Sequence, residues 1–446
     1  MILNIGLDDI DTPTGGCTTH LGYIIALKLR SKFGDRIFID YPYLVRLNPN
    51  IPWKTRGNGA VALKVNVPNT YYIEYIKKMV IDEFKEYTKL SHPTRQPAIA
   101  FHMGYVNPRL TRFYYKALRD VVTKDLLKEV ILECNIEYYT LSGKVERGLI
   151  GAIAAIGVDF SQDFTFELIA YRSKDYIGLR ERLVDVESVF YVEEKFKSTF
   201  LNVDYETKRV LITPRGPDPV LFGIRGVNPI DLVEVLKYIK TYEPIAGWII
   251  YKSNQATDVH LSFKERIADV RPYQSVIVEG IVRCKPRRIP GGHVVFTIGD
   301  SSGSIDCIAY EQTGRLRDVV EGLIIGDRVR VYGGVRPPSS KHGLTLNIEK
   351  IEIIELAPLI KYSNPKCPVC GKTMKSAGRN KGYKCPKCGY RDPKAEKVKK
   401  VLERTIKPGI YYPPPRTFKH LMKPPQRPQP NKNQIPPPTQ TKWIHP

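Results

Sequence analysis

The sequence contains no apolar run long enough to cross a membrane. Its longest weakly apolar stretch, Gly148 to Val158, is far shorter than the roughly 20 residues that a membrane-spanning helix needs. The apolar start of the chain is interrupted by Asp8 and Asp9, so we expect no secretory signal peptide. These absences predict a cytoplasmic protein without a membrane span.

A disulfide framework is also missing. Four of the eight cysteines cluster near the C-terminus, and four others follow no spacing pattern: Cys17, Cys134, Cys284 and Cys307. This distribution suits reduced thiols together with one metal site.

Acidic residues are outnumbered by basic ones. The 446 residues include 69 Lys plus Arg and 46 Asp plus Glu, which gives a formal net charge of +23. Such an excess favours a polyanionic partner such as nucleic acid, although Lys-rich surfaces also occur in heat-adapted proteins. A chain of this length predicts about three or four domains, so catalytic and binding parts can be separate.

The first two parts of the chain mix strands and helices. Residues 1–158 alternate strand-like and helix-like segments, beginning with an apolar strand and an acidic loop, which predicts an α/β domain. Residues 159–262 show the order βαββαβ, with Ser188 to Glu193 as one expected strand and Asn228 as a helix cap. This order predicts a ferredoxin-like α+β domain.

Residues 270–358 contain five strand candidates, with a helical pattern at Leu316 to Leu323 between the third and the fourth. This arrangement predicts an OB-fold β-barrel, whose first and fourth loops bind single-stranded nucleic acid. Those loops carry basic residues here, namely Lys285, Arg287, Arg288, Arg336 and Lys341. The charges indicate a nucleic-acid interface, but loop charges can also serve solvation alone.

Residues 359–395 contain the clearest metal signal. Two Cys-x-x-Cys pairs, separated by fourteen residues, supply the thiolates of Cys367, Cys370, Cys385 and Cys388. Four sulfur ligands in a closed tetrahedral shell select a structural Zn²⁺, so we expect a zinc ribbon. Its many lysines suit RNA binding, and a ribbon that stabilises only its own fold is the alternative.

The last part of the chain, residues 396–446, has no hydrophobic periodicity. Residues 397–446 hold eleven basic residues and one acidic residue, and twelve prolines lie between Pro408 and Pro446. Such a segment buries too little apolar surface to offset its ordering entropy, so we expect an extended or disordered basic Pro-rich tail. The tail suits folding onto RNA and equally suits an inert, soluble role.

The N-terminal motif combines carboxylates, glycines and threonines. Its polar members are Asp8, Asp9, Asp11, Gly15, Gly16, Thr18 and Thr19. The three carboxylates repel one another, which indicates Mg²⁺ bound between them and a phosphate. The glycine N–H groups and the start of the next helix would bind that phosphate. The lysine of a Walker P-loop is absent, and an acidic turn followed by a threonine helix cap would have the same spacing.

A second candidate phosphate loop lies between two expected strands. It contains Lys54, Arg56, Gly57 and Asn58, followed by another glycine. Cations beside glycines suit phosphate contacts, whereas Asn-Gly is also a common hairpin turn.

These motifs resemble the archaeal isoleucine-tRNA 2-agmatinylcytidine synthetase (TiaS) family. The matching stretches, which precede the barrel and the four-cysteine ribbon, are Gly6 to Gly22, Leu47 to Leu63, Arg147 to Gly157, Thr213 to Gly226 and Ser253 to Leu261. The resemblance covers almost the whole chain except the tail, and it implies that residues 1–158 form a kinase-like, ATP-binding catalytic domain. Ile10 stands where the family has threonine, and Arg215 and Ala256 stand where His and Gly are expected.

The resemblance implies a reaction. Agmatine would be attached to the 2-position of the wobble cytidine of an isoleucine tRNA with a CAU anticodon, for AUA decoding, while ATP is converted to AMP and phosphate. Because the 2-oxo group is a poor leaving group, phosphorylation would activate it. Asp8, Asp9 and Asp11 would hold Mg²⁺ on ATP, and Thr18 would lie at the γ-phosphate, where the family carries an autophosphorylated threonine. The second loop would contact phosphate or RNA.

Two other functions stay open at this stage. One is an ATP-dependent RNA-modifying ligase that uses another small amine, and the other is a non-enzymatic binder of tRNA or single-stranded nucleic acid. For agmatine itself, a carboxylate should face the guanidinium, and Asp218 and Asp258 are candidates by their loop setting. The sequence gives no indication of the oligomeric state.

Overall fold

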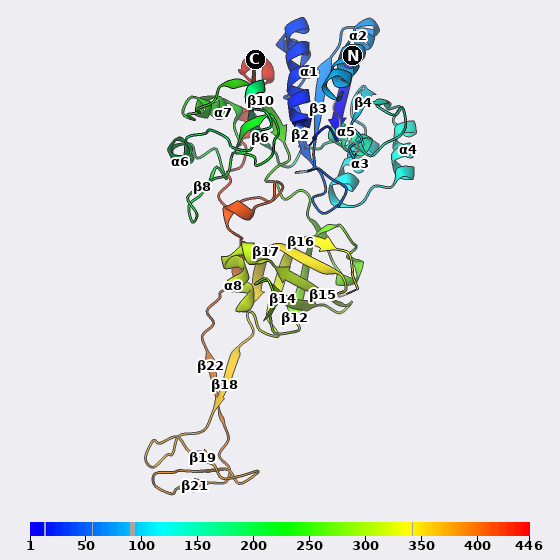
Figure 1. Ribbon diagram of the computed structural model, residues 1–446. Helices are drawn as coiled ribbons and strands as arrows, with labels where there is room; N and C mark the ends of the chain where they lie inside the picture. The colour runs from blue at the N-terminus through cyan, green and yellow to red at the C-terminus, as the bar shows by residue number, and fades with distance from the viewer. Residues whose placement is uncertain (13–14, 56, 90–93, 341) are drawn as a thin grey trace.

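The computed structural model describes residues 1–12, 15–55, 57–89, 94–340 and 342–446 and is elongated (Figure 1). A head that contains both chain ends lies above a β-barrel, and a small ribbon lies at the far end of a two-stranded stalk. Arg56 and Lys341, expected in binding loops, fall outside the described residues. Among the residues that are described, every helix is too short or too polar to traverse a lipid bilayer.

One nine-stranded sheet runs through the head in the order β5-β4-β1-β3-β2-β10-β6-β9, with β24 paired to β10. Its N-terminal strands are β1 (Ile2–Asp8), β2 (Tyr43–Arg46), β3 (Gly59–Asn66), β4 (Ala98–Met103) and β5 (Glu137–Thr140). They pair antiparallel with one another. The parallel pairing of β2 with β10 (Ile245–Ser253) joins the two halves of the head.

Helices cover both faces of the N-terminal half of this sheet. On one face, α1 (Thr18–Phe33) and α2 (Thr70–Tyr87) pack with the apolar side chains of Leu3, Ile5 and Leu7 of β1. The opposite face is covered by α3 (Pro108–Arg119), α4 (Lys124–Glu133) and α5 (Gly148–Ile156). A Cβ on Gly6 would lie 2.1 Å from the Ala152 carbonyl oxygen, so only glycine lets α5 approach β1 this closely. The start of α5 therefore lies beside the end of β1.

The second half of the head differs in part from the expected order. Its strands are β6 (Thr165–Arg172), β7 (Val203–Asp204), β8 (Arg209–Val210), β9 (Val220–Gly226) and β10, and its helices are α6 (Val186–Lys195) and α7 (Pro229–Leu236). The strand predicted at Ser188 to Glu193 is wrong, because these residues lie in α6. Asp185 caps that helix by accepting from the Ser188 N–H at 2.8 Å, and Val189 and Val192 pack into the core one turn apart.

The middle of the chain is an OB-fold barrel, as predicted. Its strands are β12 (Ser275–Val282), β14 (Val294–Gly299), β15 (Ser304–Ala309), β16 (Arg328–Arg336) and β17 (Thr345–Glu355), with β11 (Ser262–Lys264) and β13 (Arg287–Arg288) at the edges. The pairing β12-β16-β17-β15-β14 closes through β12 and β14. Helix α8 (Arg315–Glu321) lies between the third and fourth barrel strands, where the helical pattern predicted it.

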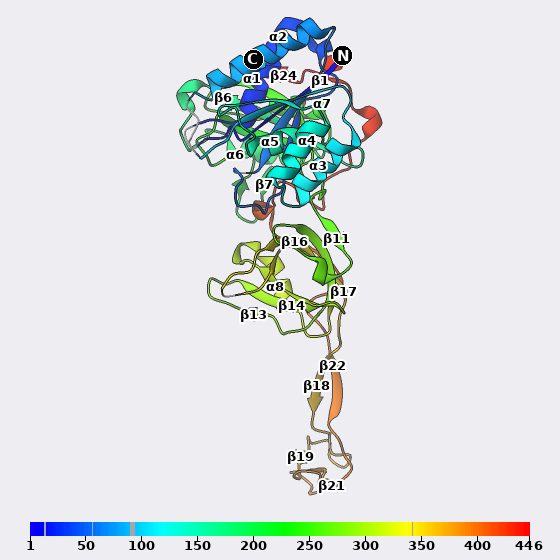
Figure 2. The same ribbon diagram turned by 90° about the vertical axis from the view of Figure 1, so that its right-hand side faces the viewer.

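The zinc ribbon hangs from the barrel on the stalk (Figure 2). The stalk pairs β18 (Leu359–Ser363) with β22 (Val398–Leu402), and the ribbon contains β19 (Lys375–Ser376), β20 (Tyr383–Lys384) and β21 (Arg391–Asp392). All four predicted cysteine sulfurs lie within 4.8 Å of one another. Sulfur pairs 3.5 Å and 3.4 Å apart suit four thiolates around one tetrahedral Zn²⁺.

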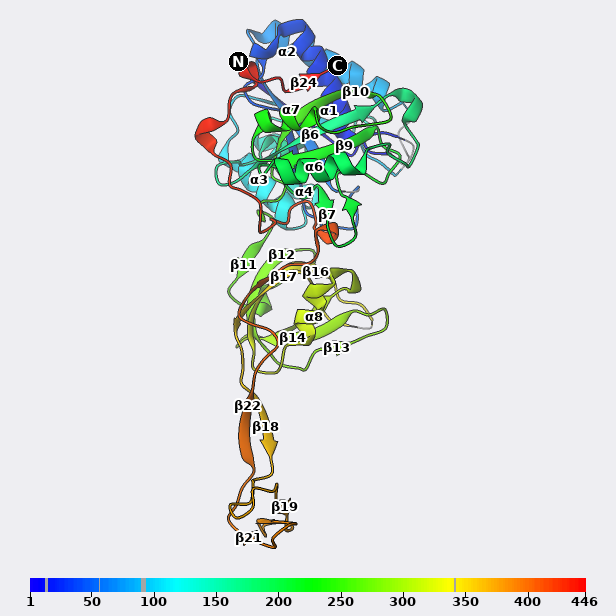
Figure 3. The ribbon, with the colours of Figure 1, turned by 90° about the vertical axis from the view of Figure 1, so that its left-hand side faces the viewer.

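The tail is extended, which is one of the two predicted alternatives, whereas the other, a disordered C-terminus, is wrong. After the stalk, β23 (Gly409–Tyr411) pairs with β17, and β24 (Ile444–His445) adds to the sheet of the head. Between them the chain runs in extended form along the head (Figure 3). Leu421, Trp443 and Ile444 are almost completely buried. A few large apolar side chains thus anchor a segment whose prolines already limit the entropy lost on ordering. We call residues 409–446 the C-terminal strap.

Candidate functional site

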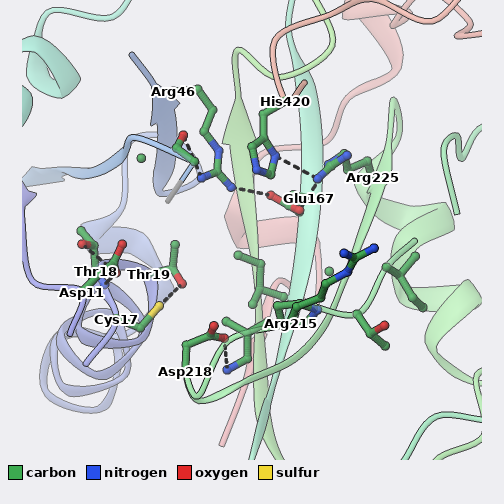
Figure 4. A pocket seen from close by; sticks show the side chains of 18 of the residues that line it. Asp11, Cys17, Thr18, Thr19, Arg46, Glu167, Arg215, Asp218, Arg225 and His420 are labelled. Carbon is green, nitrogen blue, oxygen red and sulfur yellow. Dashed lines mark hydrogen bonds and ion pairs between the residues drawn. The ribbon is translucent and has the colours of Figure 1, made fainter. Parts of the chain in front are cut away.

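A cavity of about 340 Å³ lies in the head, between the start of α1 and the sheet formed by β6 and β9 (Figure 4). The predicted residues among its walls are Asp11, Gly16, Thr18, Thr19, Gly57, Arg215 and Asp218. The others that matter chemically are Cys17, Arg46, Glu167, Arg225 and His420. The N-terminal motif, the second half of the head and the strap therefore meet around one space.

Asp11 and Thr18 form a pair at one end of this cavity. The Thr18 backbone N–H donates to Asp11 Oδ1 at 2.9 Å, and the Thr18 hydroxyl donates to the same oxygen at 3.4 Å. Burial raises the pKa of Asp11 above its usual value, although the Thr18 hydrogen bond opposes that effect. A hydroxyl and a carboxylate of this kind can hold or transfer a proton at a reacting phosphate.

Asp8 and Asp9 line a separate, smaller cavity of about 50 Å³ together with Lys54 and Asn58. Asp9 Oδ2 accepts from Arg147 Nη2 at 2.7 Å and from a backbone N–H at 3.0 Å. Burial, and then the charge of Asp9, raise the pKa of Asp8 well above its usual value. Asp9 and Asn58 both have left-handed backbones, with φ of 58° and 42°. Such strain in non-glycine residues is common at functional sites.

The positions of Asp8, Asp9 and Asp11 show which of these carboxylates suit Mg²⁺ as ligands. Within the described ranges, the four cysteines are the only group of three or more His, Cys, Asp or Glu residues whose ligand atoms all lie within 4.8 Å of one another. The three aspartates therefore do not form a single set of metal ligands. Asp8 and Asp9 share a cavity, whereas Asp11 borders two neighbouring ones. Mg²⁺ commonly uses one or two carboxylates and substrate phosphates. The pair of Asp8 and Asp9 therefore fits this ion, because a cation between them would offset the burial and repulsion that disfavour the Asp8 charge.

A third space, of about 560 Å³, lies on the other side of Asp11. Thr12 and Thr55 line it with Asp11, and the cations of Arg95 and Arg180 face the same space. Positive charge beside the Asp11–Thr18 pair suits a polyphosphate. Gly15 lines none of these spaces; its φ of 125° and its close approach to Ile177 shape the loop instead.

The opposite end of the main cavity is basic, and none of the sequence motifs predicts it. Arg46 Nη2 and Arg225 Nε lie 3.8 Å and 3.4 Å from the Glu167 carboxylate, one on each oxygen. Arg225 also reaches His420, with 3.0 Å between Nη2 and Nδ1. The charge of Arg46, together with burial, lowers the pKa of His420 well below its usual value. Two arginines around one carboxylate leave an excess positive charge facing the cavity.

One feature of the sequence could have indicated part of the basic end of the main cavity. Glu167 is a charged residue inside strand β6, whose residues are all buried. A buried charge normally has a partner or a role. His420 had no comparable signal, because it stands in a Pro-rich segment without periodicity.

The two carboxylates proposed for guanidinium binding occupy different places. Asp218 lines the main cavity, opposite Thr18 in Figure 4. Asp258 lies instead at the junction of head, barrel and strap, where it pairs with Lys350 and accepts from the Lys423 backbone N–H at 2.8 Å. Asp218 is therefore the one of the two that can meet a ligand in this cavity.

The barrel keeps its predicted basic loops at the surface. Lys285, Arg287 and Arg336 are exposed, whereas Arg288 pairs with Glu321 of α8. The ribbon likewise exposes most of its lysines, among them Lys372, Lys375 and Lys387. Both modules thus present cations to solvent, as contact with an RNA backbone requires.

Comparison with known proteins gives consistent matches along the chain. Family models described as the TiaS TCKD domain, the TiaS FLD domain, the OB-fold nucleic acid binding domain and the TiaS C-terminal zinc ribbon domain match residues 4–143, 146–260, 276–354 and 364–406. The tRNA(Ile2) 2-agmatinylcytidine synthetase TiaS of Staphylothermus marinus is 49% identical over 443 residues, which are 98% of this chain and 95% of the relative.

Solved structures agree with this match. The crystal structure of the TiaS-tRNA(Ile2)-ATP complex superposes with a TM-score of 0.86 at 37% identity, covering 98% of this chain and 99% of that one. The TiaS-tRNA(Ile2)-AMPCPP-agmatine complex superposes with a TM-score of 0.82 at 36% identity, covering 95% and 96%.

Proposed function

Because this chain belongs to the tRNA(Ile2) 2-agmatinylcytidine synthetase (TiaS) family, we propose that it joins agmatine to the wobble cytidine by first phosphorylating the 2-oxo group of that base. The chain is an enzyme of tRNA modification that uses ATP, and its partners are tRNA(Ile2) and agmatine. We expect the reaction to take place in the cytoplasm, where these substrates are. We propose both the order of the chemical steps and the roles of the individual residues.

The chemistry favours two steps. In the first, the cytosine 2-oxo oxygen attacks the γ-phosphoryl group of ATP, so that a C–O–P linkage forms, the bond from the γ-phosphorus to the bridging oxygen breaks, and ADP leaves. In the second, the primary amine of agmatine attacks ring carbon 2, a C–N bond forms, and the C–O bond breaks. Phosphate leaves with the electron pair of that bond, and the amine loses a proton. Water then cleaves the β-phosphoryl group from ADP, so that ATP is consumed overall to AMP and two phosphates, one of which carries the cytosine oxygen.

The single observation that carries the proposal is the Asp11–Thr18 pair at the meeting point of two polar cavities. Asp11 accepts from the Thr18 hydroxyl, which supports a role for Asp11 in taking the proton of Thr18 or holding it beside the γ-phosphate. Gly16 and Thr19 at the start of α1 would contribute backbone donors to that phosphate.

Asp8 and Asp9 would hold Mg²⁺, with Asp11 nearer the transferred group. When bound, the ion would neutralise charge on the phosphoryl group. Lys54 and Asn58 would contact phosphate oxygens from the same small cavity. Burial lowers the pKa of Lys54, and the charges of Lys419 and Arg336 add to that effect, so a phosphate there would relieve repulsion between cations.

Agmatine would lie with its guanidinium at Asp218. Asp11, which we assign to the phosphate, and Glu167 are the other carboxylates that line the cavity. Glu167 is already contacted by Arg46, Arg225 and Gln255, whereas Asp218 pairs with Arg182 at 3.4 Å. The cytidine must leave its stack in the anticodon loop to reach the cavity, at a cost of a few kcal/mol. Contacts of the barrel and ribbon with the tRNA backbone would offset that cost.

Oxygen labelling tests the order of steps directly. Transfer RNA(Ile2) would carry ¹⁸O at the 2-position of the wobble cytidine and react with ATP, Mg²⁺ and agmatine. Activation by phosphorylation delivers the ¹⁸O to inorganic phosphate, whereas direct displacement by the amine delivers it to water. Recovery of the label in water would refute the phosphorylated intermediate.

The role of Asp11 is tested by substitution. Asp11→Asn should lower kcat for labelled agmatine incorporation by at least about 100-fold, because the carboxylate beside Thr18 is lost. Affinity for tRNA should stay unchanged. Asp125→Asn is a matched control, since Asp125 is an exposed residue on α4 far from both cavities. Equal activity of the two variants would contradict the assignment.

A further inference from the structure

Backbone N–H groups donate hydrogen bonds that fix the C-terminal strap to the loop that follows β10. The backbone N–H groups of Ala256 and Asp258 donate to the carbonyls of His420 and Leu421, each at 2.8 Å. Asp258 Oδ1 accepts from the Lys423 N–H at 2.8 Å. Ala256 and Asp258 have left-handed backbones, with φ of 55° and 60°, which turn these donors toward the strap. The position of His420 is therefore set by backbone hydrogen bonds at His420 itself and at the residues that follow it.

The His420 side chain points from the strap into the main cavity (Figure 4). Its Nδ1 lies 3.0 Å from Arg225 Nη2 and 3.0 Å from Gln255 Oε1. The other edge of the ring closes against the phosphate-loop candidate, because a Cβ on Gly57 would lie only 3.1 Å from Nε2. One imidazole thus contacts three separate parts of the chain around the cavity.

The two partners of His420 are also the partners of Glu167. Arg225 Nε lies 3.4 Å from one Glu167 oxygen, and the Gln255 amide donates to the other. Since a neutral imidazole carries one proton, Nδ1 either accepts from Arg225 or donates to Gln255. In both cases His420 limits the rotation of a side chain that holds Glu167.

The charges around the ring keep it neutral. Arg46, Arg225 and Lys54 surround His420, and their charges, together with burial, hold its pKa well below the usual value. A neutral ring can contact Arg225 without adding a further cation to this crowded end. Arg46 Nε is buried without a hydrogen-bond partner within the described ranges, so the cavity end still offers a donor to an anion.

From this geometry we propose that His420 is a positioning residue of the catalytic cavity, which orients Arg225 and Gln255 so that Arg225 and Arg46 face a phosphate group of a substrate. The inference rests on the proposed placement of the substrates in this cavity. It makes the strap part of the working site, although the strap follows the RNA-binding modules in sequence. The phosphate belongs either to ATP or to the backbone beside the wobble nucleotide.

Steady-state kinetics with two His420 variants test the proposal. His420→Ala should raise the KM of one substrate by about tenfold to a hundredfold, as expected for a weakened hydrogen bond to a charged group, with a smaller change in kcat. An effect on the KM of ATP assigns the phosphate to the nucleotide, and an effect on that of tRNA assigns it to the backbone. His420→Asn places an amide near the position of Nδ1 and should restore most of the loss.

Two comparisons separate positioning from general loss of structure. His445→Ala changes a histidine on the same strap but away from the cavity, and it should match the wild type in both KM values. His420→Gln extends its amide toward the Nε2 position and should rescue less well than His420→Asn. Should His420→Ala fail to fold, the contrast between Asn and Gln still decides the question.

The proposal is overturned if His420→Ala leaves both KM values unchanged, or if the Asn and Gln variants are equally impaired. These outcomes differ from failure of the proposed function, which would appear in the wild-type enzyme as ¹⁸O recovered in water.

Discussion

At the scale of single residues, Asp8 combines a cost to stability with a proposed role in catalysis. It ends β1 with its carboxyl group buried, and burial and the neighbouring charge of Asp9 raise its pKa well above the usual value. A buried acid of this kind is stable in its protonated form and costs folding free energy when it ionises. Under the proposed function, a cation bound beside Asp8 would reverse this cost.

Asp8→Asn should therefore stabilise the ligand-free protein at neutral pH. The folded-state pKa of Asp8 lies above its unfolded value, so its contribution to stability is present at low pH and is lost as the pH rises through the folded pKa. The amide cannot ionise and avoids this loss. Thermal unfolding between pH 4 and pH 8 should show a higher midpoint for the variant at the upper end and convergence at the lower end.

The same substitution should nearly abolish agmatine incorporation, because the amide cannot replace a carboxylate at a cation site. Adding Mg²⁺ and ATP should raise the unfolding midpoint of the wild type more than that of Asp8→Asn. A variant with wild-type activity, or with a lower midpoint at pH 8, would contradict this account of Asp8.

The sequence reveals some site residues and conceals others for physical reasons. Asp8, Asp11 and Thr18 lie close together in the chain, so their chemistry can be recognised locally. Glu167 and His420 enter the cavity from β6 and from the strap, 253 positions apart, and only the fold brings them together. Local motifs predict residues that share a loop, and they do not predict residues that share only a cavity.

At the scale of elements, the contact between β1 and α5 sets the geometry of the acidic motif. Gly6 faces α5, and Gly151 on α5 leaves room for the Asp8 carboxylate, since a Cβ there would lie 1.8 Å from Asp8 Oδ2. Two glycines on facing elements thus let the helix start close to the end of the strand. The helix start and the carboxylates would separate if either position carried a side chain.

Gly6→Ala should destabilise the head by at least about 1–3 kcal/mol, the usual cost of overpacking a close contact. The added methyl would meet the backbone of Ala152, which cannot turn aside as a side chain could. Chemical denaturation would measure the change. Gly303→Ala is the matched control, because a Cβ there meets no atom within 4 Å and should alter stability little. Equal stability of the two variants would refute the packing argument.

Elements with strong local patterns can be predicted well. Four of the five barrel strands (β12, β14, β15 and β16) largely alternate buried and more exposed positions, so the order of the strands identifies the OB-fold from the sequence alone. The segment that forms α6 resembles a strand because Val189, Phe190 and Val192 are β-formers, whereas the cap at Asp185 favours the helix. The strap resembles a disordered tail because a few buried anchors in a long polar segment produce no periodicity.

At the scale of the whole molecule, the ribbon lies far from the cavity, at the end of an exposed stalk (Figure 1). The small core of the ribbon consists of Met374, Tyr383, Cys367 and Cys385, with Cys370 and Ala395 packed against them. Such a core cannot fold a module of this size without its metal. Loss of Zn²⁺ should therefore unfold the ribbon and leave head and barrel intact.

Removal of Zn²⁺ by a strong chelator should weaken the binding of tRNA(Ile2) and leave the binding of ATP unchanged. The unfolded ribbon would no longer hold its lysines in one arrangement, so it would neutralise fewer phosphates of the tRNA. The slope of log Kd against log salt concentration should accordingly become less steep, by roughly 0.7 to 0.9 for each phosphate that the ribbon no longer neutralises. Fluorescence anisotropy with labelled tRNA at several salt concentrations measures both effects, and restoring Zn²⁺ should recover them. An unchanged salt slope with an unfolded ribbon would show that the barrel and the head alone supply the charged contacts to the tRNA.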